Sequence, residues 1–145
     1  MPFDMKALEA QLTLDEGKRF TPYKDTMGHP TIGIGHNLDA NPLPAGWKPP
    51  LTEAQVDELF AKDVATAVNE LNMKLPWWYK MDDPRQRVMI DLTFNMGIGT
   101  LVTFHSFLRF MEEGQYSNAA TDLQGTLWYR QVGTRGPRVV ALLKS

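Results

Sequence analysis

Residues 14–36 read LDEGKRFTPYKDTMGHPTIGIGH, and the pattern of the chain changes at Gly17 within them. Before this glycine, apolar side chains recur at helical spacing, at Phe3, Leu8 and Leu12. They predict a short amphipathic helix that ends near Glu16. After the glycine, turn-forming residues and alternating polarity predict a small antiparallel hairpin between residues 20 and 38. Glu16 is therefore expected where a helix meets a sheet.

The segment from Thr31 to His36 is expected to be one strand of this hairpin. Side chains alternate along a strand, so its two isoleucines should share one face, while its two glycines lie with Thr31 on the other. The residues concerned are Ile32, Ile34, Gly33 and Gly35. The glycines would then leave room for a bulky ligand against the backbone.

The remainder of the chain predicts a linker followed by helices. Four prolines and a glycine between Asp39 and Pro50 prevent regular hydrogen-bonded structure, so a surface loop is expected there. Thr52 and Gln55 form a capping box before apolar residues that follow on one face, which predicts a long helix over about residues 52–75. Shorter helical patterns follow over residues 84–94, 104–111, 116–123 and 139–143.

This order of elements predicts an α+β fold in which one domain, residues 1–145, has two lobes. The sheet lobe covers about residues 14–50, and the helix over about 52–75 connects it to an all-helical lobe over about 76–145. The N-terminal helix is assigned to the helical lobe.

The composition of the chain narrows the classes of partner and site. Lys and Arg number 15 against 17 Asp and Glu, a formal net charge of −2, so no global positive field draws the chain to nucleic acid. No cysteine is present, which excludes disulfides, and the three histidines show none of the spacings of catalytic zinc sites. We therefore expect no metal, no cofactor and no nucleic-acid partner.

Three polar residues of the quoted stretch form a candidate catalytic set. Glu16 ends a helix, where the helix dipole favours the protonated form of a carboxyl group, as a general acid requires. Asp25 and Thr31 follow on the hairpin, and a threonine hydroxyl can both donate hydrogen bonds to a water and accept them. Taken singly, each residue also has an ordinary explanation: a solvated glutamate, an aspartate that forms a turn, and a threonine that suits a strand.

Together these residues resemble a known family. Glu16, Asp25 and Thr31 are separated by eight residues and then by five, as in the phage T4-type lysozymes of glycoside hydrolase family 24. The resemblance continues through ELFAKDV in the long helix, FNMG from residue 94 and WYRQ from residue 128, and it covers nearly the whole chain. It implies the two-lobed lysozyme-like fold. It also implies a muramidase that hydrolyses, with inversion, the β-1,4 bond between N-acetylmuramic acid and N-acetylglucosamine in peptidoglycan.

The resemblance also implies roles for single residues. Glu16 is the general acid, while Asp25 and Thr31 hold the hydrolytic water. Substrate contacts are implied at Asn37, Phe94, Ser106 and Arg135. Arg135 matches an arginine near the catalytic glutamate, where a cation favours the ionised carboxylate and opposes the helix dipole, so the balance of the two effects stays open. His36 is implied to pair with Asp63.

Three other functions are compatible with parts of the pattern. A lytic transglycosylase cuts the same bond with one acid/base and has no need of Asp25 or Thr31. A glycan-binding or tail-structure module without catalysis would not require the intact set of three residues. A zinc amidase that cuts the peptide stem would be abolished by a chelator.

The expected partner is the glycan strand of peptidoglycan, bound by a monomer. No run of 18 apolar residues occurs, and the start of the chain lacks the basic and apolar regions of a signal peptide. We therefore expect no stable membrane insertion. A phage or prophage endolysin of this kind would be made in the host bacterial cytoplasm and would act on the cell wall after release through the inner membrane.

Overall fold

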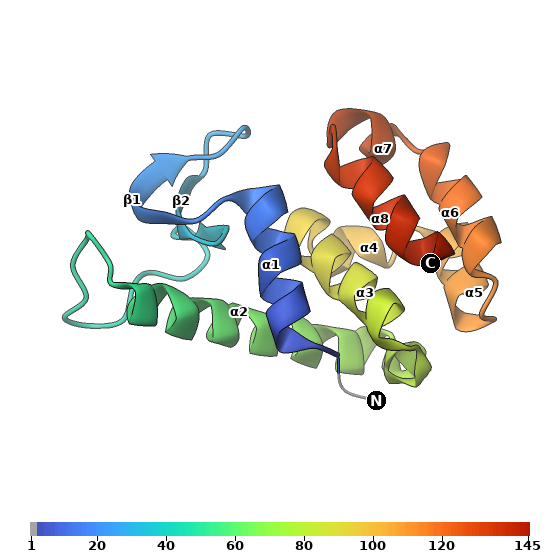
Figure 1. Cartoon of the computed structure of the whole chain (residues 1–145), viewed down its shortest axis with the longest axis horizontal. Coiled ribbons are helices and arrows are strands. Elements are labelled where there is room, and N and C mark those ends of the chain that lie inside the picture. The colour runs from blue at the N-terminus through green and yellow to red at the C-terminus, as the bar shows by residue number, and fades with distance from the viewer. Residues whose placement is uncertain (1–2) are drawn as a thin grey trace. The chain divides into compact units, whose positions relative to one another are not determined.

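The structure is a computed structural model that describes residues 3–145. In chain order the elements are α1 (Met5–Glu16), β1 (Arg19–Lys24), β2 (Pro30–Gly33), β3 (His36–Asn37), α2 (Glu53–Lys74), the 3-10 helix η1 (Pro76–Lys80), α3 (Asp83–Met96), α4 (Ile98–Leu101), α5 (His105–Glu112), α6 (Tyr116–Gln124), α7 (Leu127–Gln131) and α8 (Arg135–Lys144) (Figure 1). A small antiparallel sheet followed by a series of helices confirms the predicted α+β class.

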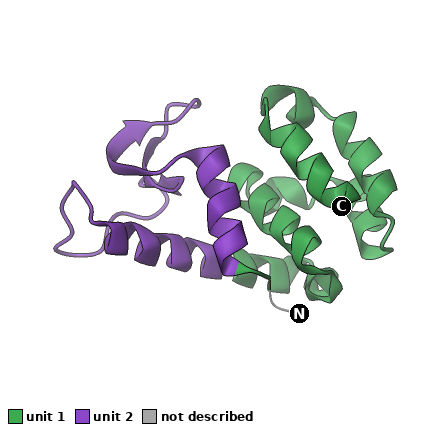
Figure 2. Ribbon diagram, in the orientation of Figure 1, with its two compact units in different colours: residues 1–4, 67–145 green, residues 5–66 purple. Residues whose placement is uncertain are grey.

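The described residues form two compact units, shown in different colours in Figure 2. One is Met5–Thr66, and the other contains Ala67–Ser145 with Phe3 and Asp4. The boundary falls inside α2, so this helix belongs to both units. The N-terminal helix, assigned from the sequence to the helical lobe, groups with the sheet in this division.

The sheet has three strands in the order β1-β2-β3, all antiparallel, rather than the two of the expected hairpin. Arg19 pairs with Gly33 and Tyr23 with Thr31, so β1 carries two more residues than β2 between these pairs. Such a bulge accommodates Pro22, which cannot donate a ladder hydrogen bond. The chain after the proline-rich loop adds to the outer edge of β1, where the Leu51 amide donates to the Phe20 carbonyl at 2.8 Å.

The expected strand from Thr31 to His36 is wrong at its centre. β2 ends at Gly33, the chain turns through Ile34 and Gly35, and β3 begins at His36. Both glycines have positive φ, +67° and +68°, a backbone conformation that a strand does not use and that glycine adopts most easily. The expected alternation of faces therefore fails, because Thr31 is buried together with Ile32 and Ile34.

Residues 5–66 have a core made by both helices and the sheet. α1 buries Leu8 and Leu12 completely, and α2 buries Val56 and Phe60 on one face. The predicted capping box is confirmed at the start of α2. The Gln55 amide donates to Thr52 Oγ1 at 3.1 Å, and the Thr52 amide donates to Gln55 Oε1 at 2.9 Å. Two backbone donors that the helix leaves unpaired are thus satisfied.

The other unit is helical, as predicted. α3 begins with Asp82 as its cap and ends at Gly97, and it packs against α8. α6 packs against both α5 and α8. The short helices α4 and α7 and the turn η1 were not predicted, and α8 begins four residues before the apolar pattern that indicated it. Each missed element has five residues or fewer, too short for a periodic pattern.

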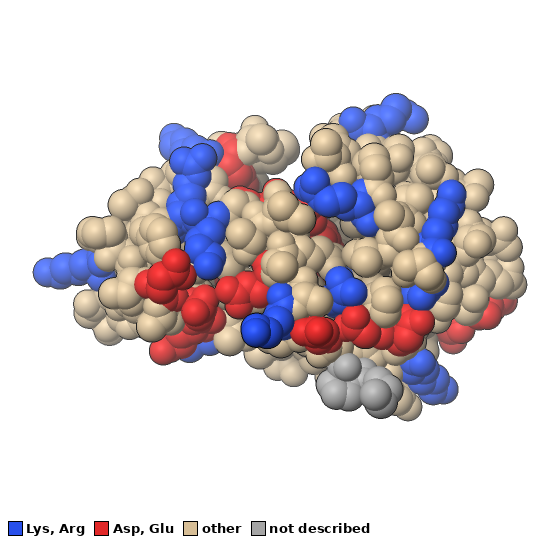
Figure 3. All heavy atoms as spheres, in the orientation of Figure 1, with Lys and Arg blue, Asp and Glu red and all other residues tan. Residues whose placement is uncertain are grey.

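Acidic and basic side chains are interspersed on the face of the molecule in Figure 3. This mixture agrees with the formal net charge of −2. Among residues 3–145, no helix combines the length and the apolar character needed to cross a bilayer.

Candidate active site

Glu16 is the last residue of α1 and is half-buried. The helix ends there because Gly17 has a φ of +79°, and the Gly17 amide donates to the Thr13 carbonyl at 2.8 Å. The Glu16 carboxylate lies against Gly35 in the turn between β2 and β3. A Cβ atom added to Gly35 would lie 2.5 Å from Glu16 Oε2. The turn therefore fits the carboxylate closely and leaves it accessible.

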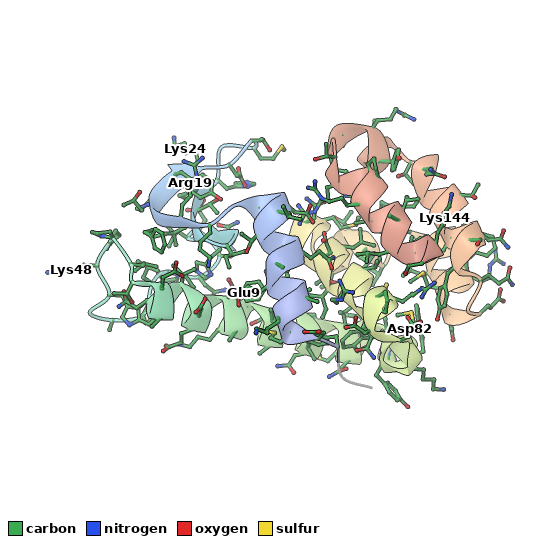
Figure 4. The ribbon with its side chains drawn as sticks, viewed as in Figure 1. Glu9, Arg19, Lys24, Lys48, Asp82 and Lys144 are labelled. Carbon is green, nitrogen blue, oxygen red and sulfur yellow. The ribbon has the colours of Figure 1, made fainter. Side chains whose placement is uncertain are left out.

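Tyr23 links Glu16 to the strand that leads to Asp25. Its hydroxyl donates to the Glu16 carbonyl at 3.2 Å, and the Arg19 guanidinium lies 4.7 Å from the centre of its ring. Arg19 and Lys24 both lie on β1 (Figure 4). Burial raises the pKa of Tyr23, the charges of Glu16 and Asp25 raise it further, and Arg19 acts against them. The two carboxylates are thus both within electrostatic range of one phenol.

Asp25 lies at the start of the turn between β1 and β2, and its two carboxylate oxygens have different surroundings. Oδ1 accepts hydrogen bonds from the Met27 amide at 2.9 Å and the His29 amide at 2.8 Å. Oδ2 lies 3.4 Å from His29 Nδ1. Burial alone would raise the pKa of Asp25, but the two amides and the charge of His29 outweigh it and lower the pKa. The carboxylate thus stabilises the turn through Oδ1, while Oδ2 accepts no hydrogen bond from these two amides.

Thr31 is only 4% exposed, on the central strand of the sheet. Its hydroxyl donates to the His29 carbonyl at 2.9 Å, so its hydrogen is already used and its lone pairs are left for a water. The Asp25 amide donates to the same carbonyl at 3.0 Å. The backbone of His29 therefore brings Asp25 and Thr31 together.

Asn37 follows on β3, paired with Thr31 across the sheet. Its Oδ1 accepts hydrogen bonds from the Asp39 amide at 2.8 Å and the Ala40 amide at 3.2 Å. The carbonyl end of the side chain thus forms a turn, and its amino group has the donors suited to a sugar hydroxyl.

Phe94, Ser106 and Arg135 belong to the helical unit. Phe94 is half-buried near the end of α3, and Ser106 is exposed in the first turn of α5. Arg135, 6% exposed at the start of α8, donates from Nε to Asp91 Oδ1 at 2.8 Å. Four of the expected site residues thus belong to the unit of residues 5–66, namely Glu16, Asp25, Thr31 and Asn37. The other three, Phe94, Ser106 and Arg135, belong to the helical unit.

His29 and Gly35 are functional candidates that the sequence analysis missed. The side chain of His29 is 52% exposed. Its backbone contacts with Asp25 and Thr31 depend on a turn that no pattern of side chains reveals. Gly35 was interpreted as space for a ligand, whereas the space that it leaves is taken by Glu16.

His36 begins β3, and its side chain is 4% exposed. Its Nδ1 lies 2.7 Å from Asp63 Oδ2 and its Nε2 lies 2.7 Å from the Asn41 carbonyl. The predicted pair with Asp63 is therefore confirmed. Both partners are acceptors, so the doubly protonated ring satisfies both contacts. Within residues 3–145 no group of three His, Cys, Asp or Glu side chains has the arrangement of a metal site.

A carboxyl group that ends a helix, and a second carboxylate linked to a threonine through the backbone of His29, supply the groups that acid and base catalysis uses. The family model for phage lysozyme matches residues 14–144, so the chain belongs to the phage lysozyme family and is a lysozyme.

Named relatives agree with this family. The chain is 30% identical to "Probable T4-type lysozyme 1" of Dictyostelium discoideum, over 97% of this chain and 95% of that protein. It is 27% identical to "Pre-baseplate central spike protein Gp5" of Enterobacteria phage T4, over 94% of this chain but 27% of that longer protein. It is 30% identical to "Endolysin" of Salmonella phage P22, over 60% of this chain and 58% of that protein.

Proposed function

We propose that this lysozyme is a muramidase that hydrolyses the β-1,4 bond between N-acetylmuramic acid and N-acetylglucosamine in peptidoglycan. Glu16 donates a proton to the leaving oxygen, and Asp25 with Thr31 holds the attacking water. The observation that carries the proposal is the turn from Asp25 to Thr31. It fixes both residues on the backbone of His29, in the same compact unit as Glu16.

The position of Glu16 suits a general acid. It closes α1, so its backbone is fixed by the helix, and the bare backbone of Gly35 limits where the carboxyl group can move. A catalytic acid gains from such restraint, because proton transfer requires a heavy-atom separation of about 2.6–3.2 Å. The half-buried side chain still reaches solvent, where a glycosidic oxygen could enter.

The second half of the site suits the activation of water. Asp25 Oδ1 is occupied by two amides, so Oδ2 is the oxygen that remains to accept a proton from water. Thr31 has given its own hydrogen to the His29 carbonyl, and it therefore accepts a hydrogen bond from the same water. With no donor from Thr31, the water turns its lone pairs away from both residues and toward the sugar.

We infer that four side chains contact the substrate. Asn37 offers its amino group, Phe94 offers an aromatic face to a sugar ring, and Ser106 offers a hydroxyl. Arg135 is held by Asp91 and bears a cation suited to a carboxyl or acetamido oxygen. The enzyme acts as a monomer in host lysis by a phage or prophage, after release to the cell wall.

A digest of purified peptidoglycan tests the proposal. We expect muropeptides with a reducing N-acetylmuramic acid, which carry the mass of one added water. A 1,6-anhydro product, with no water added, would instead identify a transglycosylase. Cleavage between glycan and peptide that is lost with a chelator would identify an amidase, and no product at all would identify a binding module.

The variant Glu16→Gln tests the role of the acid. It keeps the shape of the side chain but removes the proton, so we expect a loss of about 10² to 10⁴ in rate with the fold intact. Glu58→Gln is the matched control, because Glu58 is an exposed residue of α2 whose side chain is 57% accessible. It should digest like the wild type. Near-normal rates with folded Glu16→Gln would reject the assignment.

A further inference from the structure

The imidazole of His29 approaches Oδ2 of Asp25, the carboxylate oxygen that the amides of this turn leave available. Nδ1 lies 3.4 Å from Oδ2, within the range of an ion pair. Oδ1 is already satisfied by the amides of Met27 and His29. An imidazole that turned toward Oδ2 would therefore compete for the same oxygen that is to hold the water.

The position of His29 is fixed by its backbone rather than by its side chain. Its carbonyl accepts hydrogen bonds from the Asp25 amide and the Thr31 hydroxyl, and its amide donates to Asp25 Oδ1. Pro30 follows and fixes its own φ. The side chains of His29 and Asp25 are 52% and 38% exposed, so the pair is open to solvent and substrate. Replacing the imidazole therefore leaves the turn intact.

We propose that His29 is a positioning residue for Asp25: when the His29 imidazole is protonated, it withdraws Asp25 Oδ2 from the hydrolytic water and slows the reaction. This inference rests on the role proposed above for Asp25. It adds to the enzyme a control of rate through a residue that touches neither the sugar nor the water.

The sign follows from the charges. A cation beside Oδ2 makes the carboxylate a weaker base toward water, and it cancels part of the negative charge that stabilises an oxocarbenium-like transition state. Both effects slow catalysis while the imidazole is charged. The inhibition is present while the imidazole is charged and is relieved when it is neutral. The hydrogen bond and charge of His29 are among the causes that lower the pKa of Asp25.

Other charged groups near this turn do not produce the same signal. The pKa of Tyr23 is raised, so its hydroxyl stays neutral between pH 5 and 8. Glu16 also acts on Tyr23, and the buried pair of His36 with Asp63 lies in the same unit. These groups are unchanged in a variant at position 29, so their titration cancels when variant and wild type are compared at each pH.

The experiment measures kcat/KM on soluble glycan fragments from pH 5 to 8 for the wild type, His29→Gln and His105→Gln. We expect His29→Gln to exceed the wild type by about two- to fivefold at pH 5, as for an exposed ion pair, and to equal it at pH 8. His105 is an exposed histidine at the start of α5, so His105→Gln should match the wild type throughout. His29→Lys keeps a cation at this position and should stay slow at all pH values. A ratio of His29→Gln to wild type that does not change with pH would overturn the proposal.

A second measurement does not depend on activity. The Asp25 carboxyl carbon, followed by NMR, should titrate at higher pH in His29→Gln than in the wild type; an unchanged midpoint would also overturn the proposal. Asp25→Asn separates the two levels of inference. If it is fully active, the role of Asp25 itself fails. If it is impaired while the His29→Gln ratio stays constant with pH, only the role of His29 fails.

Discussion

The turn between β2 and β3 is built around the absence of a side chain at Gly35, because a Cβ atom there would lie 2.5 Å from Glu16 Oε2 and 2.9 Å from its Cγ. A Cβ atom does not lie this close to atoms to which it is not bonded, so either the glutamate or the turn would have to move. Gly35 also has a φ of +68°, where a side chain is strained in any case. The position of the Glu16 carboxyl group thus depends on a residue that lies 19 positions further along the chain.

We predict that Gly35→Ala displaces Glu16 and reduces activity at least tenfold. Part of the effect is backbone strain, which costs on the order of 1 kcal/mol for alanine at positive φ. Gly114→Ala is the matched control, because Gly114 has a φ of +73° with nothing within 4 Å of the added Cβ. In urea denaturation, the backbone strain should cost both variants a similar amount of stability, and the clash with Glu16 should add to this cost in Gly35→Ala alone. Only Gly35→Ala should lose activity. Equal activity of the two variants would contradict this account.

The pair of His36 and Asp63 should make stability depend on pH. Burial by itself lowers the pKa of His36, but the hydrogen bond and charge of Asp63 and the Asn41 carbonyl outweigh it, so the pKa is raised above 6.5. A raised folded-state pKa means that the stabilisation is complete below the unfolded value near 6.5 and is lost as pH rises through the folded value. We expect His36→Asn to cost about 1–3 kcal/mol at pH 5.5 and clearly less at pH 9.

The measurement is the free energy of unfolding in urea at several pH values. His105→Asn is the control, since His105 is exposed and should change stability by less than about 0.5 kcal/mol at every pH. A cost of His36→Asn that is the same at acid and alkaline pH would show that the imidazole contributes by packing and not by charge.

The longer helices of this chain could be predicted from sequence because their signals are local. The capping box at Thr52 and the one-sided apolar pattern after it placed the start of α2 within one residue. The helical pattern over residues 84–94 likewise falls within α3 (Asp83–Met96). A helix is specified by residues three and four apart, so the information needed lies within one segment.

The strands and the turns at the site could be predicted only in part. A pattern of alternating residues does not distinguish a continuous strand from two strands joined at Gly33 and Gly35, because the side chains of Ile32 and Ile34 are buried in either case. The family resemblance indicated Glu16, Asp25 and Thr31. It could not indicate that the backbone of His29 joins Asp25 to Thr31, since that contact depends on the path of the turn.

Asp91 and Arg135 form a buried ion pair in the helical unit, with side chains 0% and 7% exposed and a separation of 2.8 Å. Removing one member leaves the other charge buried, which is among the most costly single changes. We predict that Asp91→Ala destabilises the protein by about 3 kcal/mol or more, and that Asp91→Asn costs less because its amide oxygen still accepts from Arg135.

Urea denaturation measures both variants. Glu58→Ala serves as the control, since the ion pair of Glu58 with Lys62 is exposed and should contribute about 0.3–0.5 kcal/mol. A similarly small cost for Asp91→Ala would mean that Arg135 is not held by this carboxylate in solution.

Glu9 on α1 (Figure 4) carries an unfavourable charge at neutral pH. Burial raises its pKa, and the hydrogen bond and charge of Asp57 raise it further, while Lys18 opposes them. When the pKa of an acid is higher in the folded state than in the unfolded state, ionisation destabilises the fold at any pH above the folded-state pKa. This cost disappears as the pH falls below the unfolded-state pKa. Glu9→Gln should therefore stabilise the protein at pH 7 by a few tenths of a kcal/mol, about 0.5 at most, with less gain at pH 4. A thermal melt that shows a loss at pH 7 would contradict this expectation.

The stereochemical outcome of hydrolysis tests how the two halves of the site cooperate. Thr31 donates its hydroxyl hydrogen to the His29 carbonyl, and two amides occupy one oxygen of Asp25, so both residues are arranged to bind a water rather than to attack the sugar. A water between acid and base requires carboxyl groups roughly 6.5–9.5 Å apart, and we expect Glu16 and Asp25 to fall in that range when substrate is bound. The first product from the β-linked strand should then be the α-anomer, observed by NMR before mutarotation, and no covalent glycosyl-enzyme should accumulate. Asp25→Asn should retain more activity than Glu16→Gln, because an amide still orients a water whereas glutamine has no acidic proton to give. A β-anomeric first product would place a nucleophile where this mechanism places a water.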